Sequence, residues 1–497
     1  MADRKVLPPP PVFRHDPADV EGLKREAKGW EDGDKIPELG LTRVLVGPEA
    51  IAELPAVLGD LAPETGDVIL VMDETPMTRG GANLKPMVRE MMGRRGREVR
   101  PVELAGDEHG VVHPDFREVE IVKGEIRPGT VVVALGSGVI TDIAKHACLT
   151  YQQENPEGRR VPLAVCQTAN SAPAFTSGMA VISKDGVKRT WPSRLPDALV
   201  ADTQVLREAP LEYSLGGVGD MSAGFVSFGD WYLNDLVTGA GYLEASWYVL
   251  EDARELTLPY AKEIRARSPV GMEVLAKILA LGGLSMTFAG ETSPLSGYEH
   301  VVSHMLDMGA EQFGRPVASH GLQVGVATIA ASISWDRLLE NLDPKKVDVD
   351  ACYPSFGEME ERVRSAFAEV DPSGAIADEC WSDYRQKLRD WSEARSRFEA
   401  LLEDWDDAKV RLRELVPKPE AVVEALAEAG HPLLFEELNV PVPEAEARWA
   451  FRNAHLMRKR FSHGDLFFYT SFFDDTHTER VFARMHELAD LVRGRRT

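Results

Sequence analysis

Three histidines and one aspartate after residue 206 are the residues best suited to chemistry. His300 and His304 are four residues apart, so on a helix they lie on the same face. Asp220 ends a glycine-rich run, and His320 precedes an apolar run where another helix is expected to begin. A carboxylate and two or three imidazoles suit a divalent transition metal that keeps an open coordination position. Ordinary roles also fit the spacing, namely a core histidine at 304 and a helix N-cap at 220.

A second candidate site is a glycine turn in the stretch TVVVALGSGVITDIAKHAC, residues 130–148. The apolar, β-branched run Val131–Leu135 predicts a buried strand, and a helix is expected after the turn. Gly136 and Gly138 would let the backbone approach a pyrophosphate, with the N–H groups of the helix start pointing at it. Thr141 stands where a dinucleotide fingerprint has its third glycine. The pattern therefore fits either a nucleotide-binding turn or an ordinary strand–helix turn.

Polar residues follow two further apolar runs. Val68–Met72 predicts a buried parallel strand that ends in Asp73. An aspartate there either contacts an adenosine ribose or caps a turn. Val161–Gln167 predicts another strand, and the small polar residues 168–171 follow it. Ligands of open α/β sheets gather at such carboxyl ends of strands.

The elements that must position these residues change character near residue 206. Before it, strand candidates alternate with helices, which favours a mostly parallel sheet covered on both faces. Residues 178–189, with an Asp-Gly turn, predict a hairpin that carries Lys188 back towards the sheet. After residue 206, helical periodicity dominates. We therefore expect a proline-rich N-terminal extension, an α/β domain and a helical domain, at residues 1–40, 41–205 and 206–497.

The helical half contains a long segment, from about residue 340 to 440, with two amphipathic stripes. One stripe runs from Met359 to Val370, and a second, rich in aromatic residues, runs from Trp381 to Trp405. They predict two long helices broken near residues 371–374. Such stripes need a partner surface. We favour packing on their own domain, and the alternative is an oligomer contact or a lid over the cleft.

Composition limits the class of protein. The 497 residues include 56 basic and 80 acidic ones, a net charge of −24, which argues against a general nucleic-acid surface. The four cysteines form no C-x-x-C pair and are typical of free thiols in a reducing compartment. No apolar run reaches the roughly 18 residues of a membrane helix, and the proline-rich, polar residues 1–20 contain no signal-peptide apolar core. We expect a cytoplasmic protein without an integral membrane segment.

Several segments, taken together, resemble the glycerol-1-phosphate dehydrogenase family. In chain order they are GSGVITDIAK, TANS with FTSG, GVK, GGVGDMSAGFVSFGDW, SPLSGYEHVVSH and SHGLQVG. The resemblance runs from about residue 41 to 335 and resumes near Arg452–Phe468. That family belongs to the superfamily of metal-dependent alcohol dehydrogenases, glycerol dehydrogenases and dehydroquinate synthases. It implies a dehydroquinate synthase-like fold, with an N-terminal dinucleotide-binding α/β domain, an all-α C-terminal domain and an active site in the cleft between them.

The resemblance also implies roles for single residues. The family's metal ligands match Asp220, His300 and His320, and the metal is zinc, nickel or iron. Its contacts to NAD or NADP match Asp73, Gly136, Ser137, Gly138, Thr141, Asp142, Thr168 and Ser171. Its polar positions near the substrate match Lys188 and His304, and His304 or a bound water could relay the proton. The implied reaction interconverts a small alcohol and its carbonyl by hydride transfer with NAD(P), in a homodimer or larger homo-oligomer.

One departure from the family pattern concerns the substrate. Pro173 stands where the family has an aspartate that handles the substrate hydroxyls or the proton, and a proline side chain offers no acceptor. A different small carbonyl compound, phosphorylated or a phosphonate, is therefore an alternative substrate. Two other classes stay open. One is a sugar-phosphate cyclase related to dehydroquinate synthase, although its D-S-S-x-G-G-K-like segment is absent here, and the other is a non-catalytic homologue.

Overall fold

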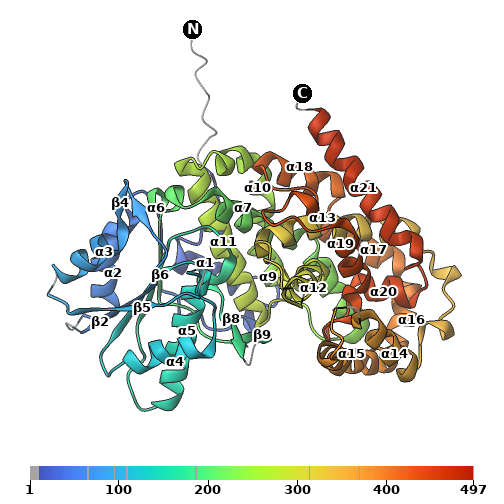
Figure 1. Cartoon of the computed structure of the whole chain (residues 1–497), viewed down its shortest axis with the longest axis horizontal. Coiled ribbons are helices and arrows are strands. Elements are labelled where there is room, and N and C mark those ends of the chain that lie inside the picture. Colours follow the sequence, from blue (N-terminus) through green and yellow to red (C-terminus); the bar gives the residue numbers. More distant parts are fainter. Residues whose placement is uncertain are drawn as a thin grey trace, which may run out of the picture. The chain divides into compact units, whose positions relative to one another are not determined.

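A six-stranded parallel sheet organises the first part of the chain in the computed structural model (Figure 1). The structure describes residues 11–495, apart from 64–65, 95, 108–109, 185–186, 313 and 369. The strand order is β1-β10-β7-β6-β2-β5. The strands are β1 Arg43–Gly47, β2 Val68–Asp73, β5 Val99–Leu104, β6 Val131–Gly136, β7 Leu163–Gln167 and β10 Ala198–Asp202. The predicted strands at 68–72, 131–135 and 161–167 are confirmed within two residues.

Contacts divide the chain into two units. The α/β unit comprises Met1–Gly217 and Leu243–Thr292, and the helical unit comprises Val218–Tyr242 and Ser293–Thr497. The predicted boundary near residue 206 differs from this division mainly because residues 243–292 group with the α/β unit. The physical reason is helix α11, Pro269–Ala289, which packs on β1 and α6 of that unit.

Helices cover the sheet of the α/β unit on both faces, as the sequence predicts. Figure 1 shows α2 and α3 on one side of the sheet and α4 and α5 on the other. Leu54 of α2 and Val88 of α3 join Leu70 and Val133 of the strands in one buried cluster. The helices of this unit are α1 Val20–Ala27, α2 Leu54–Leu61, α3 Leu84–Gly93, α4 Phe116–Glu125, α5 Gly138–Glu154, α6 Thr203–Glu208, α9 Glu244–Tyr248, α10 Glu251–Arg265 and α11, with most of α7 Leu211–Ser222.

Two small hairpins and an N-terminal helix complete this unit. The predicted hairpin is confirmed as β8 Met179–Lys184 paired with β9 Val187–Pro192, whereas the short pair β3 Thr78–Arg79 and β4 Ala82–Asn83 was not predicted. The part of the expected N-terminal extension that the structure describes contains α1, whose first turn is capped by the Asp19 carboxylate. Propensity alone did not indicate this helix, because its stability comes from burying Val20 and Leu23.

Helix α11 alone among the described helices is long and apolar enough to cross a membrane. Its 21 residues are not an unbroken apolar run, because Glu273 and Lys277 lie within the helix. In addition, 89% of its apolar window is buried inside the fold. Burial of this extent is typical of a core helix in a soluble protein, because a span in lipid would expose its apolar surface outwards.

The helical unit is built from helices alone in the part that the structure describes. They are α8 Ser227–Thr238, α12 Tyr298–Gln312, α13 His320–Asn341, α14 Phe356–Phe367, α15 Ala375–Glu393, α16 Arg395–Glu403, α17 Trp405–Leu415, α18 Pro419–Ala429, α19 Glu444–Asn453, α20 His463–Tyr469 and α21 Asp475–Gly494, with the end of α7. Helix α13 is buried on every side from Gly321 to Trp335, which explains the unbroken run of small and apolar residues there.

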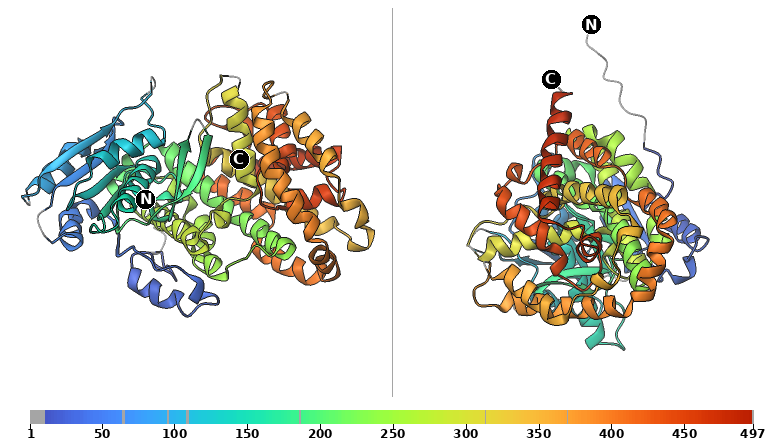
Figure 2. Two further views of the ribbon diagram at one scale, coloured as in Figure 1. Left: turned by 90° about the horizontal axis from the view of Figure 1, so that it is seen from below. Right: turned by 90° about the vertical axis from the view of Figure 1, so that its right-hand side faces the viewer.

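The amphipathic segment of residues 340–440 packs within the helical unit, which is the arrangement that the sequence analysis favours. The break near residues 371–374 is confirmed, but the second predicted helix is divided at Ala394 and Asp404 into α15, α16 and α17. Trp391 of α15 is fully buried and stacks on Phe461 and Tyr469, with ring centroids 5.2 and 4.6 Å apart. Figure 2 shows these helices, in orange and brown, among the other helices of the unit.

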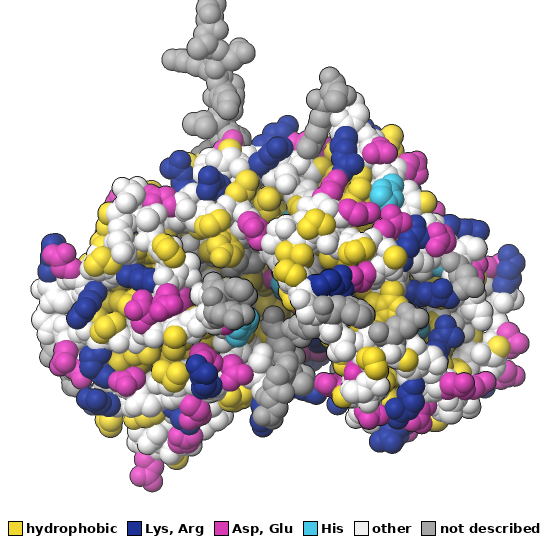
Figure 3. Space-filling view, in the orientation of Figure 1, with side chains coloured by type: hydrophobic (Ala, Val, Ile, Leu, Met, Phe, Trp, Pro, Cys, Tyr) yellow, Lys and Arg dark blue, Asp and Glu magenta, His cyan; other side chains and the backbone are white. Residues whose placement is uncertain are grey.

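The distribution of surface charge and the burial of the thiols are those of an ordinary globular protein. On the face shown in Figure 3, basic and acidic side chains are intermingled. The four cysteines are free and buried. Burial raises the pKa of Cys148 and of Cys166 to about 12, so both are neutral thiols at pH 7.

The buried stack around Trp391 predicts a large loss of stability when it is removed. Trp391→Ala should lower the free energy of unfolding of the helical unit by about 3–5 kcal/mol, because it deletes a large aromatic side chain and leaves a cavity. Urea unfolding followed by circular dichroism measures this. Val410→Ala, at a side chain that is 63% exposed, is the control and should stay within about 0.5 kcal/mol. If Trp391→Ala and Val410→Ala lowered the free energy of unfolding equally, the segment around Trp391 would not be part of the core.

Candidate metal centre and nucleotide site

The ends of three helices bring together the predicted metal ligands within the helical unit. Asp220 lies near the end of α7, His300 in the first turn of α12, and His320 at the first position of α13. The Nε2 atoms of His300 and His320 lie 3.2 and 3.9 Å from Asp220 Oδ1. The three ligand atoms all lie within 4.8 Å of one another. Ligands of a tetrahedral zinc ion lie about 3–3.5 Å apart, so these positions need only small adjustments.

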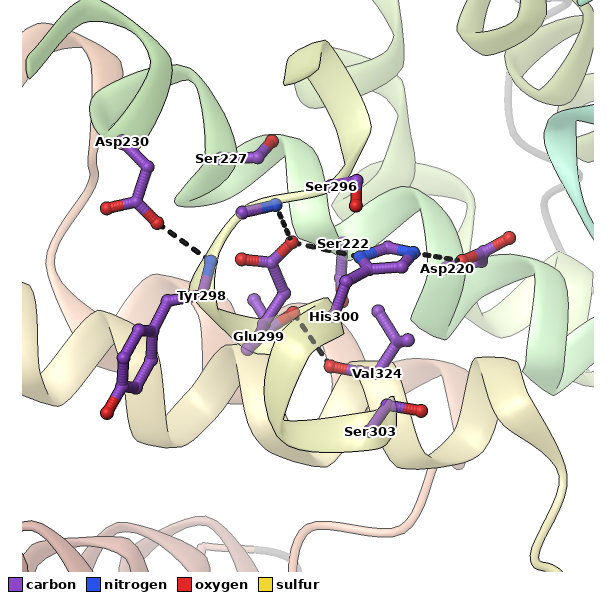
Figure 4. A network of polar contacts seen from close by, with 12 residues as sticks. Asp220, Ser222, Ser227, Asp230, Ser296, Tyr298, Glu299, His300, Ser303 and Val324 are labelled. Carbon is purple, nitrogen blue, oxygen red and sulfur yellow. Dashed lines mark hydrogen bonds and ion pairs between the residues drawn. The ribbon is translucent and has the colours of Figure 1, made fainter. Parts of the chain in front are cut away.

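The other nitrogen of each imidazole has its own partner. His300 Nδ1 lies 3.0 Å from Glu299 Oε1, so the ring lies between Glu299 and Asp220 (Figure 4). The Gly297 N–H donates to the same Glu299 oxygen at 2.7 Å. His320 Nδ1 lies 3.1 Å from the Ser303 hydroxyl. Partners on Nδ1 fix the tautomer and aim both Nε2 lone pairs at the same place, as in known metal sites. The donor set therefore fits a divalent metal ion.

The ligand set is closed on one side and open on the other. Asp220 and His300 are buried, whereas the His320 side chain is 35% exposed. The ring centroid of His304 lies 5.7 Å from that of His320. The structure thus gathers His304 with the ligand set and places both of these rings next to its open side. Three protein ligands and an accessible side are the pattern of catalytic, rather than structural, metal sites.

The buried carboxylates also control the charge of His300. Burial disfavours a charged ring, but hydrogen bonds to Asp220 and Glu299 outweigh it and raise the pKa of His300 to about 9. A proton on Nε2 and a metal ion compete for the same lone pair, because only a neutral imidazole nitrogen binds a metal.

The predicted nucleotide turn joins β6 to α5 in the α/β unit. Gly136 ends β6, Ser137 is the N-cap residue of α5, and Gly138 is its first residue. A Cβ on Gly136 would lie 2.6 Å from Cγ1 of Ile140, so no larger residue fits there. The free N–H groups at the start of this long helix form an anion-binding end. The turn therefore has the geometry that a pyrophosphate needs.

Thr141 and Asp142 are engaged with the protein itself. The Thr141 hydroxyl donates to the Ser137 carbonyl at 3.0 Å, and the Asp142 carboxylate accepts from Val181 N at 3.0 Å. Asp142 also pairs with Lys145, 2.8 Å away. Both side chains are buried. Thr141 and Asp142 would therefore contribute to nucleotide binding indirectly, by stabilising the conformation of the glycine turn.

Lys145 fixes the segment that contains Pro173. Its fully buried ammonium donates to the carbonyls of Ala174, Ser177 and Met179 at 2.7–2.9 Å. A Cβ on Gly138 would lie 3.2 Å from the Cβ of Ala174, so this segment lies beside the glycine turn. The departure at Pro173 is therefore next to the proposed nucleotide site, in a rigid short helix (Pro173–Thr176).

The remaining predicted cofactor residues lie at the same edge of the sheet. Strands β7, β6 and β2 are neighbours, and their carboxyl ends hold Thr168, the glycine turn and Asp73. Thr168 N–H donates to the Gly136 carbonyl at 3.1 Å, and Ser171 follows in the same loop. The Asp73 carboxylate accepts from the backbone N–H and hydroxyl of Thr75, so it caps a turn. Contact with a ribose stays a prediction.

Two groups of residues complete the comparison with the sequence. The side chain of Lys188 lies outside the described residues, so its role stays a prediction. Sequence reasoning missed Glu299 and Ser303 as partners of the ligands, although both lie within the motif around His300 and His304. Their position directly beside the two histidines was the available signal.

Comparisons with known proteins bear on the family and the fold of this chain. The family model described as iron-containing alcohol dehydrogenase matches residues 45–210. A glycerol-1-phosphate dehydrogenase of Bacillus licheniformis is 30% identical over 384 residues, covering 75% of this chain and 92% of that protein. That of Bacillus subtilis is 25% identical over 394 residues, with coverages of 79% and 83%. The glycerol dehydrogenase structure from Schizosaccharomyces pombe has a TM-score of 0.52 at 15% identity and covers 89% of this chain and 91% of that one.

The parallel sheet with its glycine turn and the carboxylate–imidazole ligand set define the class of metal-dependent, NAD(P)-linked alcohol dehydrogenases. The similarity to the Schizosaccharomyces pombe structure supports the fold alone. Within this class, the chain belongs to the glycerol-1-phosphate dehydrogenase family.

Loss of either imidazole ligand should abolish metal retention. His300→Ala and His320→Ala should each leave less than one-tenth of the metal content and of the turnover, because two ligands bind a divalent ion far more weakly than three. Elemental analysis after dialysis measures the metal. His304→Ala is the matched control on the same helix face, and it should keep its metal while losing turnover. A His300→Ala protein with full metal content would contradict the ligand assignment.

The raised pKa of His300 predicts a pH dependence of metal binding. Its value of about 9 lies above the ordinary 6.5, so the proton stabilises the metal-free fold below about pH 6.5, and this contribution disappears as the pH rises through 9. A metal ion must displace the same proton. The affinity for Zn²⁺ should therefore rise by up to about tenfold per pH unit between those values, as chelator competition can measure. A pH-independent affinity would show that His300 is already neutral.

Proposed function

We propose that this protein interconverts a small phosphorylated carbonyl compound and its alcohol with NAD(P)H or NAD(P)⁺. The first pair to test is dihydroxyacetone phosphate and glycerol-1-phosphate, because the Bacillus relatives carry the latter in their names. The observation that carries the proposal is the convergence of Asp220, His300 and His320, with both imidazoles held at Nδ1 and aimed through Nε2.

The proposed roles divide between the two parts of the chain. We assign nucleotide binding to residues 41–205 and metal binding to residues 206–497, with residues 1–40 as an extension and 340–440 as an insertion. Asp220, His300 and His320 hold the metal, which is zinc, nickel or iron. The nucleotide contacts are assigned to the glycine turn and to the strand ends, namely Asp73, Gly136, Ser137, Gly138, Thr141, Asp142, Thr168 and Ser171.

The chemistry follows from these assignments. A divalent ion held by Asp220, His300 and His320 would supply Lewis acidity for the substrate oxygen, and a nicotinamide nucleotide held at the glycine turn would supply the hydride chemistry at the adjacent carbon. Reduction of the carbonyl then needs one proton at the oxygen. His304, beside His320, is the proposed residue that holds this proton, and Lys188 is proposed to contact the substrate. Glu299 and Ser303 keep the ligand imidazoles in orientation throughout.

Pro173 supports a changed contact to the substrate. The residue is buried and has neither a side-chain acceptor nor a backbone N–H to replace the aspartate that the family has there. A different small carbonyl compound is therefore the second candidate substrate. A sugar-phosphate cyclase and a non-catalytic homologue are the alternatives outside this reaction class, and both would lack steady-state consumption of NADH.

Two further proposals concern location and assembly. Four buried free thiols support a reducing compartment, and we propose the cytoplasm. We also propose a homodimer or larger homo-oligomer, which light scattering of the purified protein tests directly.

The decisive experiment combines binding and turnover. Elemental analysis should give about one transition metal per chain, and titration should show binding of NADH or NADPH. Nucleotide oxidation is then followed with dihydroxyacetone phosphate, with unphosphorylated dihydroxyacetone and with a panel of small aldehydes. Turnover of dihydroxyacetone phosphate supports the first substrate. Turnover of another carbonyl alone would show that Pro173 marks a changed pocket, and metal and nucleotide binding without any turnover would overturn the proposal.

A further inference from the structure

Helix α7 carries Asp220 and helix α13 carries His320. The two helices cross at glycine residues, so their backbones are in direct contact. Gly219 precedes Asp220 in α7, and Gly325 lies five residues after His320 in α13. A Cβ on Gly325 would lie 2.9 Å from the Gly219 Cα, and a Cβ on Gly219 would collide with the Gly321 carbonyl oxygen. No side chain separates the helices, so direct contact of the backbones sets how close they come, and what packs beside the crossing keeps them from shifting apart.

The residue beside the crossing is His431, which follows α18 at the end of the insertion. Its ring is buried and lies against both glycines, since a Cβ on Gly219 or on Gly325 would come within 2.5 Å of its Nε2. Its Nδ1 lies 2.7 Å from the Pro432 carbonyl, which fixes the ring orientation. Burial lowers the pKa of His431 to about 4, although hydrogen bonds with the backbone of Pro432 and Gly321 act to raise it. The ring is therefore neutral at pH 7.

We propose that His431 is a positioning residue for the metal centre, acting as a wedge that holds α7 and α13 at the separation that Asp220 and His320 need to share one metal ion. The inference rests on the proposed metal centre. It also gives the insertion a task at that centre, through a residue more than 100 positions from any ligand in the chain.

The geometry leaves little tolerance for movement of these helices. Asp220 Oδ1 and His320 Nε2 are 3.9 Å apart, and metal–ligand distances in working sites vary by only about 0.2 Å. Removing the ring would leave a cavity beside the crossing into which the helices can relax. The ligand atoms would then have to be drawn back together on metal binding, which lowers the affinity without removing a ligand.

The test compares two buried histidines that pack on the same helix. His431→Ala removes the ring beside Gly325. His477→Ala removes a ring that lies 3.2 Å from the Ser334 hydroxyl of α13, about 21 Å along the helix from His320. Chelator competition with Co²⁺ should show a 10- to 100-fold weaker affinity for His431→Ala, the scale of other supporting residues of metal sites. His477→Ala should stay within about twofold of the natural protein.

Two readouts separate positioning from a general loss of stability. The visible absorption spectrum of bound Co²⁺ should change in His431→Ala, because the ligand geometry changes. Added imidazole should restore both the affinity and the spectrum by refilling the cavity, and the same addition to the natural protein corrects for imidazole that binds Co²⁺ directly. If His431→Ala does not fold, His431→Val serves instead, because it fills part of the space beside the two glycines with a side chain smaller than the ring. It too should bind Co²⁺ more weakly.

The outcomes distinguish this inference from the proposed function. If the natural protein binds neither Co²⁺ nor Zn²⁺, the metal centre and the inference fall together. If it binds Co²⁺ and His431→Ala binds it equally well with an unchanged spectrum, the metal centre stands and the positioning role is overturned. Equal losses in His431→Ala and His477→Ala, with no effect of imidazole, would overturn it as well.

Discussion

The near contact of α7, α12 and α13 is the constraint on which the helical unit depends. One metal site requires side chains from three helices to meet within a few ångströms, whereas packed helices usually lie 8–10 Å apart between their axes. Glycines at 219 and 325 allow the closer approach of α7 and α13. Helix α13 must then be enclosed on all sides, and its buried stretch from Gly321 to Trp335 reflects this position. The small and apolar residues of α13 are therefore those that a helix enclosed on all sides requires, and His320 lies at its start.

Electrostatics impose a second condition on the same place. Asp220, His300 and Glu299 are buried in line, and a buried carboxylate is costly unless it is paired or bound to a metal. The imidazole between the two carboxylates can balance part of their charge by taking up a proton, which is why its pKa is raised. A divalent ion at Nε2 provides the same compensation more fully. The arrangement that stabilises the protonated ring is therefore also the one that attracts a metal, and proton and metal are alternatives at one atom.

The sequence predicted the α/β unit well because its signals are local. Continuous apolar runs such as 68–72 and 131–135 mark buried parallel strands, and the glycine turn follows directly from residue type. The convergence of Asp220, His300 and His320 was predictable from a motif resemblance, since each lies in a short recognisable segment. The helix at Val20–Ala27, the division of α15 to α17 and the wedge at His431 were not, because each depends on packing against residues distant in the chain. Grouping residues 243–292 with the α/β unit depends on tertiary contact in the same way.

The long segment of residues 340–440 lies against the helices of the candidate site without supplying a predicted ligand. Trp391 of its aromatic stripe stacks on Phe461 and Tyr469, and burial of this kind helps to compensate for the entropy of ordering the segment. Lys387 of α15 is fully buried and pairs with Asp465 at 2.9 Å while donating to the His455 carbonyl. A buried pair of this kind is weak evidence for stability, but breaking it is costly, so it favours one arrangement of α15 over others. A segment fixed in this way delivers the chain to His431 in one position, beside the glycines at which α7 and α13 meet.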